Sequence, residues 1–138
     1  VGKVLQMTYS TSTAKPATSS TALVSSGFSV SITPKKIGSK IRVQFHNNFW
    51  TSATIEGGGV AIHNGTTNLH AAGNYSLGDF VYSNAGTDDY FNLYTEAFYT
   101  TTSLTTQTFT LWFRSWTGST VKLNNHAGLA TAVATEIA

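Results

Sequence analysis

Residues 27–46 read GFSVSITPKKIGSKIRVQFH and contain two segments in which apolar and polar side chains alternate. The first segment covers residues 28–33 and stops at Pro34, which has no backbone N–H to donate to a neighbouring strand. The second covers residues 40–46 and follows the turn residues Gly38-Ser39. Because successive side chains of a strand point to opposite faces, this period of two predicts two β-strands, each covered on one face only.

The composition agrees with a β-rich fold. Only 10% of the 138 residues are charged and 41% are hydrophobic. A helical domain would be expected to carry about 25% charged residues, whereas abundant serine and threonine are typical of β-rich extracellular surfaces. The length suffices for one core, so we expect residues 1–138 to form a single domain, the C-terminal head of a longer protein.

A hairpin is expected over residues 59–71, because Asn64-Gly65 tolerates the positive φ angles that a type I′ turn requires. In that register Val60 faces Leu69 and Ile62 faces Thr67, all four on the core face. His63 and His70 would then lie on the opposite face. The preceding residues 56–59, Glu-Gly-Gly-Gly, are interpreted as a flexible or tightly turned loop.

Further strands are predicted by the same alternation of apolar and polar residues. They cover residues 3–9, 89–101, 105–116 and 130–137. The spacing of strands and turns predicts an all-β antiparallel sandwich or jelly roll of about eight to ten strands.

Residues 89–101 and 105–116 are expected to pair with each other, and together they hold more large side chains than one core face needs. One face of this ribbon would meet the core. A monomer would leave the aromatic rings of the other face partly in water. Those rings are Tyr90, Tyr94, Phe98, Trp112 and Trp116.

Three interpretations of the five rings remain open: a subunit interface, sheet curvature that buries part of both faces, and a platform for stacking sugars. Rings that bury about 150–250 Å² each reach the scale of half an ordinary interface. An oligomer therefore has the most free energy to gain, and we favour a subunit interface.

Charge and cysteine content exclude several classes of function. Eight Lys and Arg against six Asp and Glu give a formal net charge of +2, too weak a field to predict nucleic-acid binding. No cysteine is present, which removes disulfides, thiol catalysis and thiolate metal sites. No apolar run approaches the roughly 18 residues of a membrane span, so membrane insertion is not expected.

Catalytic and metal chemistry have little support in the sequence. The predicted hairpin register separates His63 from His70 by roughly 13 Å, too far for one zinc ion to bridge. Glu56 and Asp79 are the most plausible carboxylate pair, yet solvated loops and turn capping explain them as well. We expect no catalytic residue, no metal and no cofactor, and hence no enzyme.

Four segments carry a resemblance to a known family: residues 2–6 (GKVLQ), 27–34 (GFSVSITP), 39–43 (SKIRV) and 135–138 (TEIA). With the Ser/Thr-rich stretch between the first two, they resemble the C-terminal head domains of tail-fibre and related structural proteins of tailed bacteriophages, including marine and cyanobacterial ones. The resemblance spans the chain, although residues 49–86 match no motif of the family. It therefore transfers no binding residues in that segment.

The resemblance implies a jelly-roll sandwich similar to tumour-necrosis-factor and C1q heads, assembled as a homotrimer on a virion. It also implies a partner on the host surface, either a glycan or an outer-membrane receptor. Two other functions stay open: a purely structural capsid decoration or fibre component, and a secreted C1q-like or lectin-like binding module.

Glycan binding would need stacking rings and planar polar side chains on exposed loops. The candidates are Trp50, His63, Asn64, His70, Asn74, Tyr75, Tyr82, Asp88 and Asp89.

Overall fold

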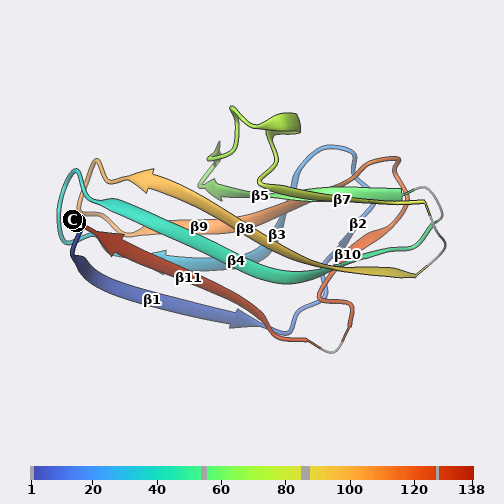
Figure 1. Ribbon diagram of the computed structural model, residues 1–138, viewed down its shortest axis with the longest axis horizontal. Helices are drawn as coiled ribbons and strands as arrows, with labels where there is room; N and C mark the ends of the chain where they lie inside the picture. Colours follow the sequence, from blue (N-terminus) through green and yellow to red (C-terminus); the bar gives the residue numbers. More distant parts are fainter. Residues whose placement is uncertain (1, 54–55, 85–87, 127) are drawn as a thin grey trace.

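The computed structural model describes residues 2–53, 56–84, 88–126 and 128–138, which form two antiparallel sheets that pack as a sandwich (Figure 1). Sheet A contains β1 (Val4–Ser12), β2 (Ala17–Thr18), β4 (Lys40–Thr51), β8 (Asp89–Thr100), β10 (Val121–Leu123) and β11 (Ala130–Ile137). Sheet B contains β3 (Val24–Ile32), β5 (Glu56–Asn64), β6 (Thr67–Asn68), β7 (Asp79–Ser83) and β9 (Gln107–Ser115). One 3₁₀ turn, η1 (Asn74–Ser76), lies between β6 and β7.

The strand order is jelly-roll-like. In sheet A, β4 pairs with β8 along its whole length, and its other edge pairs first with β11 and then with β10. In sheet B, β5 lies between β9 on one side and β7 and β6 on the other. Spatial neighbours are distant in sequence, since β1 pairs with β11 and β3 pairs with β9. The predicted all-β antiparallel sandwich is confirmed.

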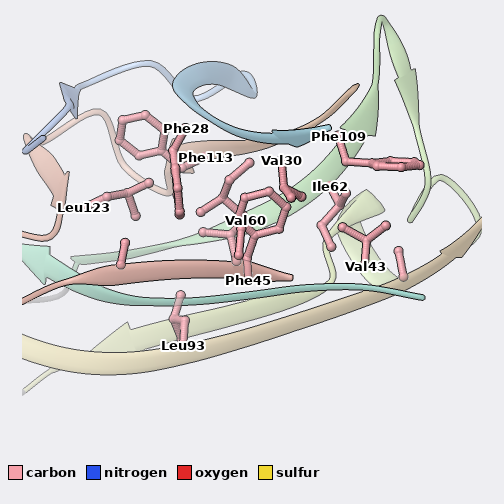
Figure 2. Packing of buried hydrophobic residues seen from close by; sticks show 14 of the residues in the cluster. Phe28, Val30, Val43, Phe45, Val60, Ile62, Leu93, Phe109, Phe113 and Leu123 are labelled. Atoms are coloured by element: carbon pink, nitrogen blue, oxygen red, sulfur yellow. The ribbon is translucent and has the colours of Figure 1, made fainter. Parts of the chain in front are cut away.

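Alternating apolar residues of both sheets meet in the core, as the sequence pattern predicts (Figure 2). Phe45 from sheet A and Phe28 from sheet B meet edge to face, with ring centroids 5.3 Å apart. Phe109 and Phe113 of β9 are also buried, and each large side chain removed from water stabilises the fold by about 1.5–3 kcal/mol. The core therefore joins the two sheets across their whole inner faces.

The strands predicted at residues 89–101 and 105–116 are present, but their expected pairing is wrong. β8 pairs with β4 in sheet A, whereas β9 pairs with β3 and β5 in sheet B. The connection at residues 101–106 has no tight-turn signal and is long enough to cross the roughly 10 Å between packed sheets. Hydrophobic alternation alone identifies these strands but does not specify the neighbour of either.

The loop expected at Glu56-Gly57-Gly58-Gly59 is instead the start of the buried strand β5. These glycines serve close packing on both faces of sheet B. A Cβ at Gly57 would lie 2.7 Å from Cδ1 of Trp116, and one at Gly59 would lie 2.4 Å from Cδ1 of Leu77. On the inner face, a Cβ at Gly58 would lie 2.6 Å from Cζ of Phe49. Large side chains therefore occupy the space that side chains of β5 would otherwise fill.

The hairpin after β5 turns one residue later than expected. Asn64 pairs with Thr67, so Gly65-Thr66 forms the two-residue loop, with Gly65 at φ 58°. Asn64 stays in the strand, where its Nδ2 donates to Oε1 of Gln107 on β9 at 2.9 Å. The shift leaves Thr67 exposed instead of on the core face, while the predictions for Val60 and Ile62 hold.

Two buried carboxylates fasten turns near opposite ends of the sandwich. The Glu56 carboxylate accepts hydrogen bonds from the backbone N–H groups of Gly57 at 2.8 Å and Trp116 at 3.1 Å, and from the Thr117 side chain. The Glu136 carboxylate accepts hydrogen bonds from the backbone of Lys35 at 2.9 Å and the hydroxyl of Ser39 at 2.6 Å. Both glutamates are fully buried, so each ties a loop to the end of a strand.

The same hydrogen bonds decide the charge state of both glutamates. Burial by itself raises the pKa of a carboxyl, but the bonds from Thr117 and Gly57 outweigh it and hold the pKa of Glu56 below its ordinary value. Burial also raises the pKa of Glu136. The hydrogen bonds from Ser39 and Lys35 outweigh this effect and lower that pKa below its ordinary value. Both residues are therefore ionised at neutral pH.

Replacing Gly58 by alanine tests the close packing of β5. The new Cβ would lie 2.0 Å from the carbonyl oxygen of Arg114, so we expect Gly58→Ala to destabilise the protein by about 1–3 kcal/mol or more in urea unfolding followed by circular dichroism. Gly128→Ala is the control, because its Cβ would meet nothing closer than a carbonyl oxygen at 3.7 Å. Equal stability of the two variants would contradict this account of the strand.

Replacing either buried glutamate by glutamine tests the two fastenings. Glu56→Gln and Glu136→Gln should each cost about 2 kcal/mol or more of unfolding free energy at pH 7, because an amide cannot accept every bond that a carboxylate accepts. Since both pKa values are lowered on folding, the parent's advantage should shrink as the pH falls below the ordinary value of 4.5. Glu96→Gln, at a half-exposed ion pair, should cost less than about 1 kcal/mol.

Candidate functional site

The five rings expected on one face lie on two. Tyr90, Tyr94 and Phe98 of β8 project from the outer face of sheet A and are 45%, 49% and 58% exposed. Trp112 of β9 and Trp116 just beyond it are half-buried on the outer face of sheet B. The single aromatic face is therefore wrong, for the same reason as the predicted ribbon: β8 and β9 belong to different sheets.

The outer face of sheet A is broad and partly apolar. Besides the β8 rings, Met7 and Tyr9 of β1 are 64% and 78% exposed. The strand register places Tyr9, Val133, Gln44 and Glu96 in one row across β1, β11, β4 and β8. Within this face Arg42 and Glu96 form an ion pair with a shortest N–O distance of 2.6 Å. Two of its charges thus neutralise each other.

The outer face of sheet B carries a compact group of rings, Tyr75, Phe80, Tyr82 and Trp116, which we call the aromatic corner. These rings line an open hollow of about 380 Å³. The Tyr75 and Trp116 ring centroids are 5.0 Å apart with an interplanar angle of 80°, and Phe80 meets Trp116 at 6.5 Å and 74°. Rings at steep angles to one another leave both faces and edges open to a ligand.

The segment between β6 and β7, which carries η1 and stands off from the strands at the top of Figure 1, supplies Tyr75 to the corner. Tyr75 and Ser76 both have φ 57°, a left-handed conformation that bulky residues rarely adopt. The segment is held at Leu77, which covers Gly59, and at Gly78, whose N–H donates to the Val60 carbonyl at 2.9 Å. The Tyr75 side chain is nevertheless 67% exposed.

A second aromatic contact on sheet B buries the predicted histidine. The His63 ring stacks on Trp112 with centroids 4.2 Å apart and an interplanar angle of 5°, and His63 is only 6% exposed. Burial lowers the pKa of His63 and of His70, and a positive charge on His63 lowers the pKa of His70 further. His70 lies in a turn beyond β6 and is not among the residues that pair with β5, so the expected strand register does not apply to it.

The histidines are not joined by further metal-ligating groups. No cluster of three or more His, Cys, Asp or Glu side chains occurs among the residues that the structure describes. Both ring nitrogens of His63 and Nε2 of His70 are buried without a hydrogen-bond partner in the described chain. Neutral imidazoles suit such an environment, because a charged ring would lose its hydration there.

The other glycan candidates are scattered over several places. Trp50 is buried on sheet A beneath Lys122, and its Nε1 donates to Asp88 at 3.1 Å. Asp89 accepts a hydrogen bond from Ser83 and, with Tyr82, lines a hollow of about 280 Å³. The structure does not describe the Asn74 side chain. Of the nine predicted residues, only Tyr75 and Tyr82 share the aromatic corner.

Glu56 and Asp79, the carboxylates considered for catalysis and disfavoured, both have structural roles. Glu56 is fully buried in its fastening, and Asp79 accepts bonds from the backbone N–H groups of Phe80 at 2.9 Å and Tyr94 at 3.2 Å. The second bond links β7 to the edge strand β8. Sequence reasoning missed Phe80, because it predicted no strand at residues 79–83. Its alternation with Tyr82, two residues away, was the available signal.

Within the described ranges, no helix has the length and apolar character needed to cross a membrane.

Comparison with known proteins gives only distant structural similarities. No protein family matches the chain, and neither does any curated protein. The chain is similar to the C-terminal domain of EclA, described as a sugar-binding protein, with 7% identity and a TM-score of 0.41 over 91% of this chain and 78% of that one.

Two similar structures come from infectious bursal disease virus. The structure of the Gx strain has 14% identity and a TM-score of 0.45 over 95% of this chain and 36% of that one. The VP2 subviral particle has 12% identity and a TM-score of 0.44 over 96% of this chain and 37% of that one. At such TM-scores these similarities say nothing about the function of this chain.

The buried histidines predict loss of stability in mild acid. Because folding lowers both pKa values from about 6.5, the unfolded chain binds more protons, and the unfolding free energy should fall as the pH drops below 6.5. His63→Phe retains a ring to stack on Trp112 and should flatten this dependence in urea titrations between pH 7.5 and 5.5. His46→Asn, at an exposed position, should leave it unchanged. A parent with constant stability across this range would contradict the prediction.

Proposed function

We propose that this chain is a non-enzymatic, homotrimeric head of a bacteriophage tail fibre or related virion appendage that attaches to glycans on the host surface. The observation that carries the proposal is the division of exposed rings between two outer faces. One face is suited to assembly with copies of itself, and the other is free to meet a ligand. The family resemblance of the strand and turn motifs supplies the virion context.

Self-association uses the outer face of sheet A. Met7, Tyr9, Tyr90, Tyr94 and Phe98 together offer on the order of 500 Å² of side chain to cover, a large part of the roughly 800 Å² that each partner buries in a stable interface. Arg42 and Glu96 pair with each other within the face, which also carries Lys40 and Lys122. Its exposed apolar area, and not its charge, is what suits it to a second copy of this chain.

Attachment uses the outer face of sheet B, which assembly through sheet A leaves accessible. There the aromatic corner combines exposed rings with a hollow, the combination by which proteins stack sugars. Catalysis is not part of the proposal, because Glu56 is occupied in fastening a turn and Asp79 in bridging β7 to β8.

A charge placed on either outer face separates assembly from attachment. In sedimentation equilibrium at micromolar concentration, the parent should have three times the mass of the chain. Phe98→Asp should shift it to the monomer, because each interface would bury an unpaired carboxylate. Phe80→Asp, at a ring 51% exposed on sheet B, is the matched control and should remain trimeric.

Two results would overturn the assembly proposal: a monomeric parent, or a Phe98→Asp variant that stays trimeric. A trimer that binds no glycan would leave a structural capsid decoration or fibre component as the function. A secretion signal encoded upstream of residue 1 would instead indicate a secreted C1q-like or lectin-like module.

A further inference from the structure

We propose that the aromatic corner is a saccharide-binding site specific for acidic sugars, with Arg114 as the group that pairs with the sugar carboxylate. The proposal rests on the glycan attachment proposed above and assigns it a place and a ligand class. Three features support it: the rigidity of Trp116, the strained backbone of Tyr75, and the guanidinium of Arg114 against the Trp116 ring.

Trp116 is fixed before any ligand arrives. Its Nε1 donates to the Val81 carbonyl at 3.2 Å, and its ring lies against the bare backbone of Gly57. Its backbone N–H donates to the Gly57 carbonyl at 2.9 Å and to the Glu56 carboxylate at 3.1 Å. A residue held at its indole N–H, at its ring face and at its backbone loses little conformational entropy when a ligand stacks on the ring.

The backbone of Tyr75 is strained. The residue has φ 57° and ψ 15°, and the following Ser76 is also left-handed. Burial does not repay this strain, because the Tyr75 side chain is mostly in water. Strained positions of this kind occur at binding sites, where the geometry serves a ligand. Here the strain places a phenol ring at the open side of the hollow, perpendicular to Trp116.

The shape of the corner favours a sugar over a flat aromatic ligand. Tyr75, Phe80 and Trp116 meet one another at 74° to 80°, so they form a corner and not a parallel slot. A pyranose can stack its C–H face on one ring and turn its hydroxyl edge towards solvent and the tyrosine hydroxyls. A nucleobase could stack on only one of these rings, because no two of them are parallel.

Arg114 supplies the charge that selects among sugars. It is the only formally charged side chain that points outward from β3, β5, β7 or β9 in the described chain. Its Cζ lies 4.8 Å from the centroid of the Trp116 ring, and its Nε donates to the Ser115 carbonyl at 3.3 Å.

The outer nitrogens of this guanidinium remain available to a ligand. The one ion pair among the described residues joins Arg42 to Glu96, so Arg114 has no carboxylate partner there. A planar guanidinium binds a carboxylate with two parallel hydrogen bonds. The ligand that completes the site is therefore a sugar that carries a carboxylate, such as a sialic or uronic acid.

Titration calorimetry on the parent trimer tests the proposal with three probes: sialyllactose, an oligogalacturonate and lactose. We expect at least tenfold tighter binding of one acidic probe than of lactose, with an affinity that falls as salt is added. Tyr75→Ala should weaken that binding at least tenfold. Arg114→Gln should remove the preference, so that the acidic probe and lactose bind this variant with similar affinity. The relative affinity of the two acidic probes distinguishes sialic from uronic acid.

Leu104→Ala is the control, since Leu104 is an exposed apolar residue of the connection between β8 and β9, outside both the sheet A face and the aromatic corner, and should leave saccharide affinity at the parent value. Parent affinity in both Tyr75→Ala and Arg114→Gln would overturn this site, while glycan attachment elsewhere on the head would stand. Equal affinity for lactose and the acidic probes would overturn the selectivity. A trimer that binds none of the probes, and nothing on a broad glycan array, would overturn the attachment as well.

Discussion

The close packing of large side chains against the backbone of Gly57, Gly58 and Gly59 is the contact on which the rest of the structure depends. Phe49 reaches the strand from the core, while Trp116 and Leu77 cover it from outside. The same strand begins at Glu56, whose carboxylate gathers the turn after β9. One short segment thus closes the core, positions Trp116 and anchors the segment that carries Tyr75.

Much of the fold follows from hydrophobic alternation, which is a local property. The last strand begins and ends where predicted, at Ala130 and Ile137, and the buried positions of β3, β4 and β9 follow the period of two. Pairing is not local. The alternation in residues 89–116 does not distinguish a hairpin from two strands in different sheets, because both arrangements bury the same alternate side chains; the only local sign is the lack of a tight turn at residues 101–106. The glycines of β5 were wrongly predicted to form a loop for a related reason. The side chains that pack against them, Phe49, Leu77 and Trp116, are distant in sequence.

The sequence predicts some residues of the candidate site but not their arrangement. Tyr75, Tyr82 and Trp116 are recognisable as rings without an obvious place in one core, but β7 and the left-handed turn at Tyr75 gather them. That no carboxylate among the described residues pairs with Arg114 depends on the composition of the whole outer face of sheet B. His63 shows the opposite case, because a residue expected on a surface is covered by stacking on Trp112. Sequence composition does not tell which of these side chains stay exposed and which are buried.

The segment between Asn68 and Asp79 belongs to no ladder of either sheet, although it forms one wall of the aromatic corner. It is attached at its two ends, by the N–H of Leu69 to Ile62 and by Leu77 and the backbone of Gly78 to β5, while the ring that faces solvent comes from η1. Insertions and substitutions there change the wall of the corner without shifting the register of any strand. The surface chemistry of the corner can therefore vary through this segment while the pairing of the strands stays the same.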